Sequence, residues 1–269
     1  MSIDIGNAPV GTPPDSTQQQ QMRLALGAIG DAPIDGQKYV RKDGEWVYLI
    51  PPSSKAYDSG NNVLFEETSD AIPDDWTQTN SAAVASVSFI PTLTSIGSFA
   101  FYYCTALTGV MIPNSVSSIG SGAFSYCFAL TSITIPDSVT SIDNYAFRGC
   151  TALTSVTLPN NPTSLGFSVF AYCTALTSIT IPDSVTSIGD SEFAGCTALT
   201  SVTIPSSVDS IGNQAFSGCS GLNYIACLAS TAPTLGSNAF LNILATEIHV
   251  PVAATGYGTT FGGLTVVNI

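Results

Sequence analysis

A 23-residue repeat constrains this chain more than any other feature of its sequence. Cysteine recurs at that interval, with phenylalanine three residues before each cysteine and leucine three residues after it. The repeating cysteines are Cys104, Cys127, Cys150, Cys173, Cys196 and Cys219. One unit reads A-F-x-x-C-x-x-L-x-x-I-x-I-P-x-x-V-x-x-I-G, and the array runs from residue 87 to about 250. A fixed period of this kind is typical of a solenoid, whose coils bury their apolar side only by stacking on one another.

Each unit contains the signals of one β-strand and several turns. The stretch L-T-S-I-T-I-P alternates apolar and hydroxyl side chains, which predicts a half-buried strand ended by proline. P-D-S-V is typical of a turn, I-G is interpreted as a flexible corner, and A-F-x-x-C as a short helical or irregular turn on the far side. We therefore expect a solenoid of parallel β-strands with about six to seven coils, the strands lying about 4.8 Å apart.

The repeated cysteines have three interpretations. A solenoid repeats every core position, so they fit a column of small buried hydrophobic residues with weak S–H donors, which we favour. Disulfides are the second interpretation, although stacked thiols point the same way and an odd total, with Cys227 as the seventh, cannot all pair. Metal binding is the third, but the chain has no C-x-x-C pair and a single histidine, His249. We expect neither a metal nor another cofactor.

The array resembles the BspA-like, or treponemal-type, leucine-rich repeats. The resemblance covers residues 87 to about 255 and rests on stretches such as TIPDSVTSIGDSEFAGCTALTSVTIP and on the ending IHVP. It implies a curved right-handed solenoid with roles in adhesion and surface recognition, without catalysis. Members with known roles are usually exported, whereas the N-terminus here lacks the basic and apolar regions of a secretory signal.

The N-terminal part, residues 1–57, has a different composition. It is expected to be extended, with a short helix through QQQQMRLALGAI and a small hairpin that turns at Asp43-Gly44. The stretch DAPIDGQKYVRKDGEWV resembles a motif of tail-fibre and other virion proteins of tailed bacteriophages, and RLALGAIG before it is similar to fibre proteins. The resemblance implies a protein that is assembled in the host cytoplasm and released in the virion. A small hairpin that merely caps the array is the alternative.

This interpretation divides the chain into an attachment segment (1–57), a linker that caps the solenoid (58–86) and the solenoid with its C-terminal cap (87–269). The attachment segment is expected to bind other virion proteins, and its candidate docking residues are Arg23, Leu24, Leu26, Tyr39 and Trp46. A homo-oligomer is expected, although no coiled-coil heptad supports a particular symmetry.

Charge excludes some partners. The chain has 6 basic and 19 acidic residues, and beyond residue 80 its only basic residue is Arg148. A protein this acidic, with no basic patch, is not expected to bind nucleic acid. No apolar run approaches eighteen residues, so membrane insertion is not expected.

The sequence shows no catalytic motif. G-x-S-x-G, a P-loop and G-x-G-x-x-G before a helix are all absent from it. Asp137 and Asp183 fall two coils apart, about 10 Å, near the upper end of an inverting glycosidase spacing, but both lie in turns that aspartate caps. Asp190 and Glu192 form the only close acidic pair of the array, which we interpret as a solvated loop. We therefore expect no enzyme, and a glycan-cleaving spike is the less favoured alternative.

Aromatic residues stand beside several cysteines where other coils have small ones. This candidate partner-binding set is Tyr102, Tyr103, Tyr126, Phe128, Tyr145, Arg148 and Tyr172. Aromatic and arginine side chains dominate interface energetics, so the set predicts contact with a host-cell surface protein or glycan, or with a neighbouring subunit. Threonine rows on the strand face make ice binding conceivable, but threonine is also an ordinary solvent-facing strand residue. We interpret the chain as a bacteriophage tail-fibre or other surface protein of a virion, with a cellular BspA-like adhesin as the alternative.

Overall fold

The computed structural model describes residues 39–42, 45–48, 54–57, 63–67, 71–72, 74–76, 81–162 and 164–269. The chain separates into two compact units, Met1–Pro52 and Ser53–Ile269. In the first, β1 (Tyr39–Lys42) pairs antiparallel with β2 (Glu45–Tyr48), with Lys42 opposite Glu45. This register confirms the predicted hairpin. Tyr39 and Trp46 lie on its two strands, whereas the expected helix, with Arg23, Leu24 and Leu26, lies outside the described residues.

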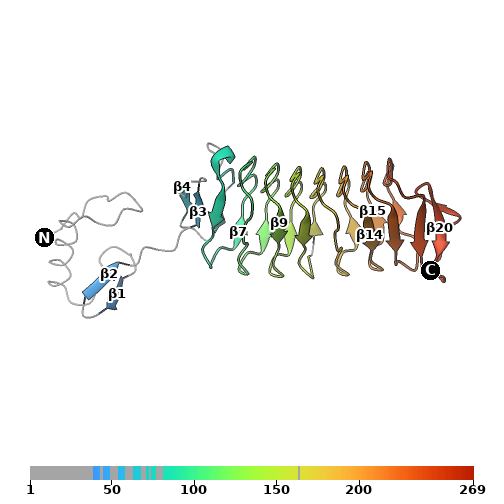
Figure 1. Cartoon of the computed structure of the whole chain (residues 1–269). Coiled ribbons are helices and arrows are strands. Elements are labelled where there is room, and N and C mark those ends of the chain that lie inside the picture. The colour runs from blue at the N-terminus through green and yellow to red at the C-terminus, as the bar shows by residue number, and fades with distance from the viewer. Residues whose placement is uncertain are drawn as a thin grey trace. The chain divides into compact units, whose positions relative to one another are not determined.

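The second unit is the expected solenoid, with its coils following one another in chain order (Figure 1). The predicted strands form a parallel ladder in which each residue faces its equivalent in the next coil, as Ser132 faces Ser155. The first part of this ladder is β9 (Ser132–Thr134) and β11 (Ser155–Thr157), and the second part is β14 (Ser201–Ile204), β16 (Tyr224–Cys227), β18 (Glu247–Val250) and β20 (Leu264–Asn268). β11 and β14 are not paired with each other among the strands that the structure describes. At its C-terminal end, β19 (Thr260–Phe261) folds back antiparallel against β20.

A second parallel ladder occupies the place predicted to be a flexible corner, so that prediction is wrong. Its strands are β5 (Ala71–Ile72), β7 (Ser95–Ile96), β8 (Ser118–Ile119), β10 (Ser141–Ile142), β12 (Ser164–Leu165), β13 (Ser187–Ile188), β15 (Ser210–Ile211) and β17 (Thr234–Leu235). The glycine that follows serves close packing, because a Cβ on Gly120 would lie 2.6 Å from the backbone nitrogen of Ser98. Among the described strands, β12 and β13 are not paired, so the ladder divides between them.

The A-F-x-x-C segment forms the third side as an irregular turn, as expected. Two residues in each coil take left-handed backbone angles, for example Gly122 and Tyr126, both with φ 61°. The segment also bonds to the next coil, where the amide of Phe124 donates to the carbonyl of Ala146 at 2.8 Å. Every side of the coil is therefore hydrogen-bonded to its neighbour, which holds the stacking distance constant around the whole coil.

The N-terminal end of the solenoid is covered by chain that precedes the first full coil. There β3 (Ser54–Tyr57) pairs antiparallel with β4 (Val63–Glu67) and β6 (Ser86–Ser88), and a short 3₁₀ turn (Ser81–Ala83) precedes β6. Trp76 packs edge-on against Phe101, with ring centroids 5.5 Å apart. The ring of Trp76 therefore covers Phe101 at the N-terminal end of the core.

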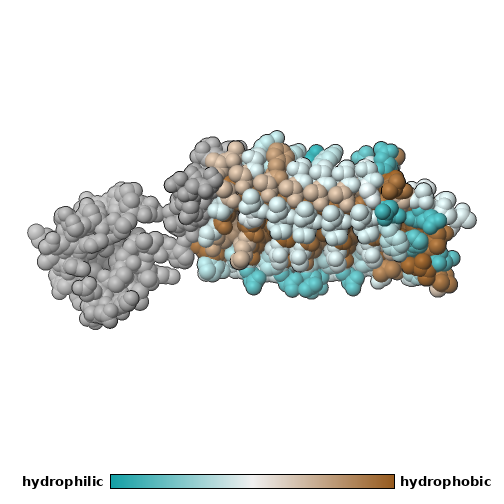
Figure 2. Space-filling view, viewed as in Figure 1, coloured by the Kyte–Doolittle hydropathy of each residue, from teal (hydrophilic) through white to brown (hydrophobic). Residues whose placement is uncertain are grey.

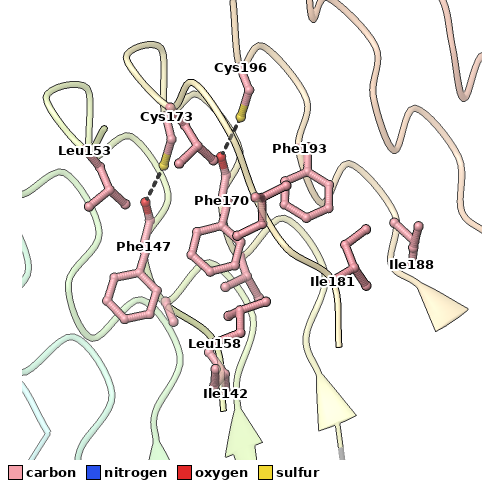
Figure 3. Packing of buried hydrophobic residues seen from close by; sticks show 14 of the residues in the cluster. Ile142, Phe147, Leu153, Leu158, Phe170, Cys173, Ile181, Ile188, Phe193 and Cys196 are labelled. Atoms are coloured by element: carbon pink, nitrogen blue, oxygen red, sulfur yellow. Dashed lines mark hydrogen bonds between the residues drawn. The ribbon is translucent and has the colours of Figure 1, made fainter. Parts of the chain in front are cut away.

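A column of phenylalanines forms the centre of the core. Phe101, Phe124, Phe147, Phe170, Phe193, Phe216 and Phe240 stack ring on ring along the axis, with centroids 5.0–5.9 Å apart and planes within 14° of parallel. Leucine and isoleucine side chains pack beside them (Figure 3). A 23-residue unit is stable only in an array because most of these ring contacts join different coils.

The thiols form a second buried column. All seven cysteines are free and fully buried. Each thiol from Cys127 to Cys219 donates to a phenylalanine carbonyl of the preceding coil, as Cys173 Sγ does to Phe147 O and Cys196 Sγ to Phe170 O, both at 3.2 Å (Figure 3). Burial raises the pKa of Cys150 to about 12, so its thiol stays protonated. These contacts confirm the core interpretation, and the disulfide alternative is wrong.

Candidate interaction surface on the turn side

Five aromatic side chains on the first coils form one connected surface, which we call the aromatic patch: Phe99, Tyr102, Tyr103, Tyr126 and Phe128. Each ring lies within 5.1–6.0 Å of at least one other, measured between centroids. Four of them are exposed over 37–42% of their surface, and Tyr126 is half-buried at the centre. The turn side therefore presents a cluster of rings to solvent.

The backbone holds three of these side chains in a demanding conformation. Phe99, Tyr103 and Tyr126 all have φ between 54° and 61°. A left-handed angle costs a residue with a Cβ about 1–2 kcal/mol, and three other coils place glycine at the position of Tyr103, as Gly149, Gly195 and Gly218. Glycine would meet the backbone requirement at lower cost, so the rings are there for contacts that glycine cannot make.

Part of that contact is with the next coil. A Cβ on Gly149 would lie 2.6 Å from Cδ1 of Tyr126, so the tyrosine ring covers this glycine. Tyr172 covers Gly195 in the same way, at 2.7 Å. These two rings therefore support the stack from outside, while Tyr103 lies against another ring.

The remaining predicted residues, Tyr145, Arg148 and Tyr172, form a separate group with Phe167, which we call the arginine cluster. The guanidinium carbon of Arg148 lies 5.4 Å from the ring centroid of Tyr145 and 5.2 Å from that of Tyr172. Phe167 packs edge-on against Tyr145 at 4.7 Å. In the described part of the chain, no ring contact joins this cluster to the aromatic patch, so the predicted set divides into two.

Two members of these surfaces were missed by sequence reasoning. Phe99 stands at the left-handed position that Gly122, Ser168 and Ser191 hold in later coils, so comparison of equivalent positions could have identified it. Phe167 is 40% exposed and follows a glycine at a corner that varies between coils, which leaves little signal.

The carboxylates considered for catalysis have structural environments. Asp137 accepts hydrogen bonds from the backbone and side-chain amides of Asn160 in the next coil, at 2.8 and 3.0 Å. Asp190 accepts one from the backbone amide of Asn213 at 2.6 Å. Asp183 is exposed in its turn. This cross-coil capping explains the presence of Asp137 and Asp190 at their positions.

Glu192 corrects the prediction of a solvated acidic pair. Its side chain is 1% exposed and occupies the column that alanine fills at Ala100, Ala146 and Ala215. Neither carboxyl oxygen has a hydrogen-bond partner within the described residues. Burial raises the pKa of Glu192 to about 8, and the nearby backbone of Val169 opposes this rise only in part. The group is therefore protonated at neutral pH, and its partner Asp190 alone is solvated.

The strand face carries rows of hydroxyl groups that bond within the solenoid. Thr131, Thr154, Thr177 and Thr200 each donate to the carbonyl of the equivalent threonine one coil earlier, at 3.0–3.4 Å. Figure 2 shows that much of the visible solenoid surface is close to neutral in hydropathy. These rows therefore reinforce the ladder, and ice binding has no feature beyond them to support it.

The repeat array matches a known family. The BspA type leucine rich repeat region matches residues 77–200 and 186–260, in six copies. Nothing before residue 77 belongs to that match. No curated protein matches the chain. No helix in the described part of the chain is long and apolar enough to cross a membrane.

Two solved structures are similar to this chain. The T. pallidum leucine rich repeat protein is 24% identical with a TM-score of 0.56, covering 84% of this chain and 92% of its own. A leucine rich cell surface protein from Faecalibacterium prausnitzii is 28% identical with a TM-score of 0.58, covering 89% and 77% respectively. The first likeness is evidence of the fold alone. From the family match, which spans more than half of the sequence, and from the stacked coils, the chain belongs to the BspA type leucine rich repeat family.

Proposed function

We propose that this protein recognises a surface by direct contact, as a BspA-type adhesin on a bacterial cell, and that it does so without catalysis. The aromatic patch is the observation that carries the proposal. It gathers exposed rings on an array whose strand face carries a row of threonines that bond to one another. The F. prausnitzii relative, described as a cell surface protein, supports the cellular setting.

Rigidity suits the solenoid to this role. The coils are bonded to one another on three sides, so the exposed rings are held in place before any partner arrives. Binding then orders few additional groups, which lowers its entropic cost.

Adhesion can be measured with beads coated with the full chain. We expect more of these beads than of albumin-coated beads to bind to the partner cells. Beads coated with the Tyr103→Ala/Tyr126→Ala variant should lose most of that binding. Tyr224→Ala is the matched control, because Tyr224 is 41% exposed but lies outside the patch, stacked on His249. Equal adhesion by wild type and albumin would refute the function. Immunogold labelling of the producing cell tests its location.

A second candidate is a tail fibre or other surface protein of a bacteriophage virion. The stretch DAPIDGQKYVRKDGEWV favours it, since its residues 39–42 and 45–47 lie in the β1–β2 hairpin of the separate unit Met1–Pro52. On this proposal the N-terminal unit docks to other virion proteins and the solenoid contacts the host. Co-sedimentation of the protein with purified virions would favour the fibre, and its absence there would favour the adhesin.

A further inference from the structure

We propose that the aromatic patch binds an uncharged glycan, in a segment a few sugars long. This proposal rests on the recognition function above and names the chemistry of the partner. It is argued from the charge, size, polarity and rigidity of the patch.

The two coils that carry the patch contain no charged residue. Between Asp75 and Asp137 there is no aspartate, glutamate, lysine, arginine or histidine. Charged residues border these coils without belonging to them: Asp74 accepts a hydrogen bond from the amide of Ser98, and Arg148 of the next coil lies over the rings of Tyr145 and Tyr172. Because electrostatic complementarity normally guides association of charged partners, a neutral surface favours a neutral ligand.

The exposed area is small for a protein partner. An aromatic side chain has roughly 150–250 Å² of surface, so four rings exposed over 37–42% offer about 220–420 Å². A stable protein interface buries about 800 Å² on each partner. The patch supplies between about a quarter and about half of that, which suits a short oligosaccharide better than a folded protein.

The chemistry of the rings also suits a sugar. Aromatic faces pack against the C–H face of a pyranose, and phenolic hydroxyls both donate to and accept from sugar hydroxyls. Within the described residues, the phenolic oxygens of Tyr102, Tyr103 and Tyr126 have no hydrogen-bond partner in the protein. The patch therefore offers apolar faces and free polar groups side by side, as small-molecule sites do.

The left-handed backbone at Phe99, Tyr103 and Tyr126 adds to the argument. The turn imposes left-handed angles at the same two positions in every coil, and the first coil differs in carrying aromatic residues at both of them. Three later coils have glycine at the position of Tyr103 (Gly149, Gly195 and Gly218) and keep the same fold, so folding does not require a ring at that position. Their backbones are fixed by cross-coil bonds such as Tyr103 N to Ser125 O at 3.0 Å.

The test uses the full-length protein and soluble probes. Native gels containing dextran, laminarin, yeast mannan or xyloglucan measure retardation, with hyaluronan as the charged comparison. We expect at least one neutral polysaccharide to retard the wild type, with little change on adding salt. Tyr103→Ala/Tyr126→Ala should weaken this binding about tenfold or more, Phe128→Ala should weaken it by less, and Tyr224→Ala should leave it unchanged. Circular dichroism confirms that each variant is folded.

Other outcomes overturn the proposal. Retardation by none of the neutral probes, or equal retardation of wild type and patch variants, would remove the glycan site. In the bead assay, adhesion that survives periodate treatment of the cells but is lost after trypsin would assign the patch to a protein partner. Each of these results leaves the recognition function standing, whereas failure of the beads to adhere at all removes the function itself.

Discussion

Replacing Glu192 should stabilise the solenoid, and the gain should grow with pH. In the folded chain the pKa of this carboxyl is about 8, against an ordinary value of 4.5. Between these values the folded state keeps a proton that the unfolded state has lost, so the free energy of unfolding falls as pH rises through this window. The thiols of Cys173 and Cys196 face the carboxyl and stay neutral, because burial raises their pKa values too.

The magnitude follows from the shift. Each pKa unit corresponds to about 1.4 kcal/mol. Relative to its value at acidic pH, the free energy of unfolding of the wild type is therefore lower by about 3 kcal/mol at pH 7 and by about 5 kcal/mol above pH 9. Glu192→Gln abolishes the titration and keeps the size of the side chain. Glu192→Ala also restores the residue of its column, as at Ala146 and Ala215.

Urea unfolding from pH 5 to pH 9 measures the effect as the stability difference between variant and wild type. We expect that difference to rise with pH and to level off above pH 8. Glu247→Gln is the matched control, because it makes the same chemical change at a glutamate that is exposed to solvent. A difference between Glu192→Gln and wild type that does not vary with pH would refute the assignment of a buried, protonated carboxyl.

Three further predictions concern the columns and the turn. Phe147→Ala removes a ring stacked between two others, at 5.4 and 5.6 Å, and should lower the free energy of unfolding by about 3–5 kcal/mol in urea titrations, whereas the exposed Phe128→Ala should change it little. All seven cysteines should resist iodoacetamide in the native protein and react in urea, as read by mass spectrometry; labelling of a native thiol would contradict its burial. Tyr126→Val should destabilise the protein more than Tyr126→Gly. A β-branched residue is strained at φ 61°, whereas the glycine variant loses only the contacts of the ring. Equal urea midpoints for the two variants would argue against a left-handed turn.

The repeat period alone predicted the stacked coils, the longer strands and the buried thiols. These features follow from side-chain types that recur at fixed positions, and every coil repeats the evidence. The two-residue strands such as Ser141–Ile142 were missed, since alternation needs at least four residues to be distinguished from a turn. Their hydrogen bonds depend on the neighbouring coil, which no local pattern records.

The error at Glu192 has a different cause. Its position in the repeat is that of Ala146 and Ala215, so the period placed it in the core, but its charge suggested solvent. Side-chain chemistry is a weaker guide than register in a solenoid, because the stack fixes which way each position points. The cost of the buried carboxyl is reduced by protonation, which sequence reasoning did not consider.

In an array of equivalent coils, a residue can differ from the type that is usual at its repeat position. The consequences depend on whether that position faces the core or the solvent. An inward departure such as Glu192 disturbs a column that runs through the whole core, so its effect falls on stability. An outward departure such as Tyr103 leaves the columns intact and changes only what one coil presents to solvent. Recognition can therefore vary along the solenoid at little cost to the fold. The aromatic patch, confined to the first coils while the phenylalanine and cysteine columns continue through the array, has the arrangement that this separation predicts.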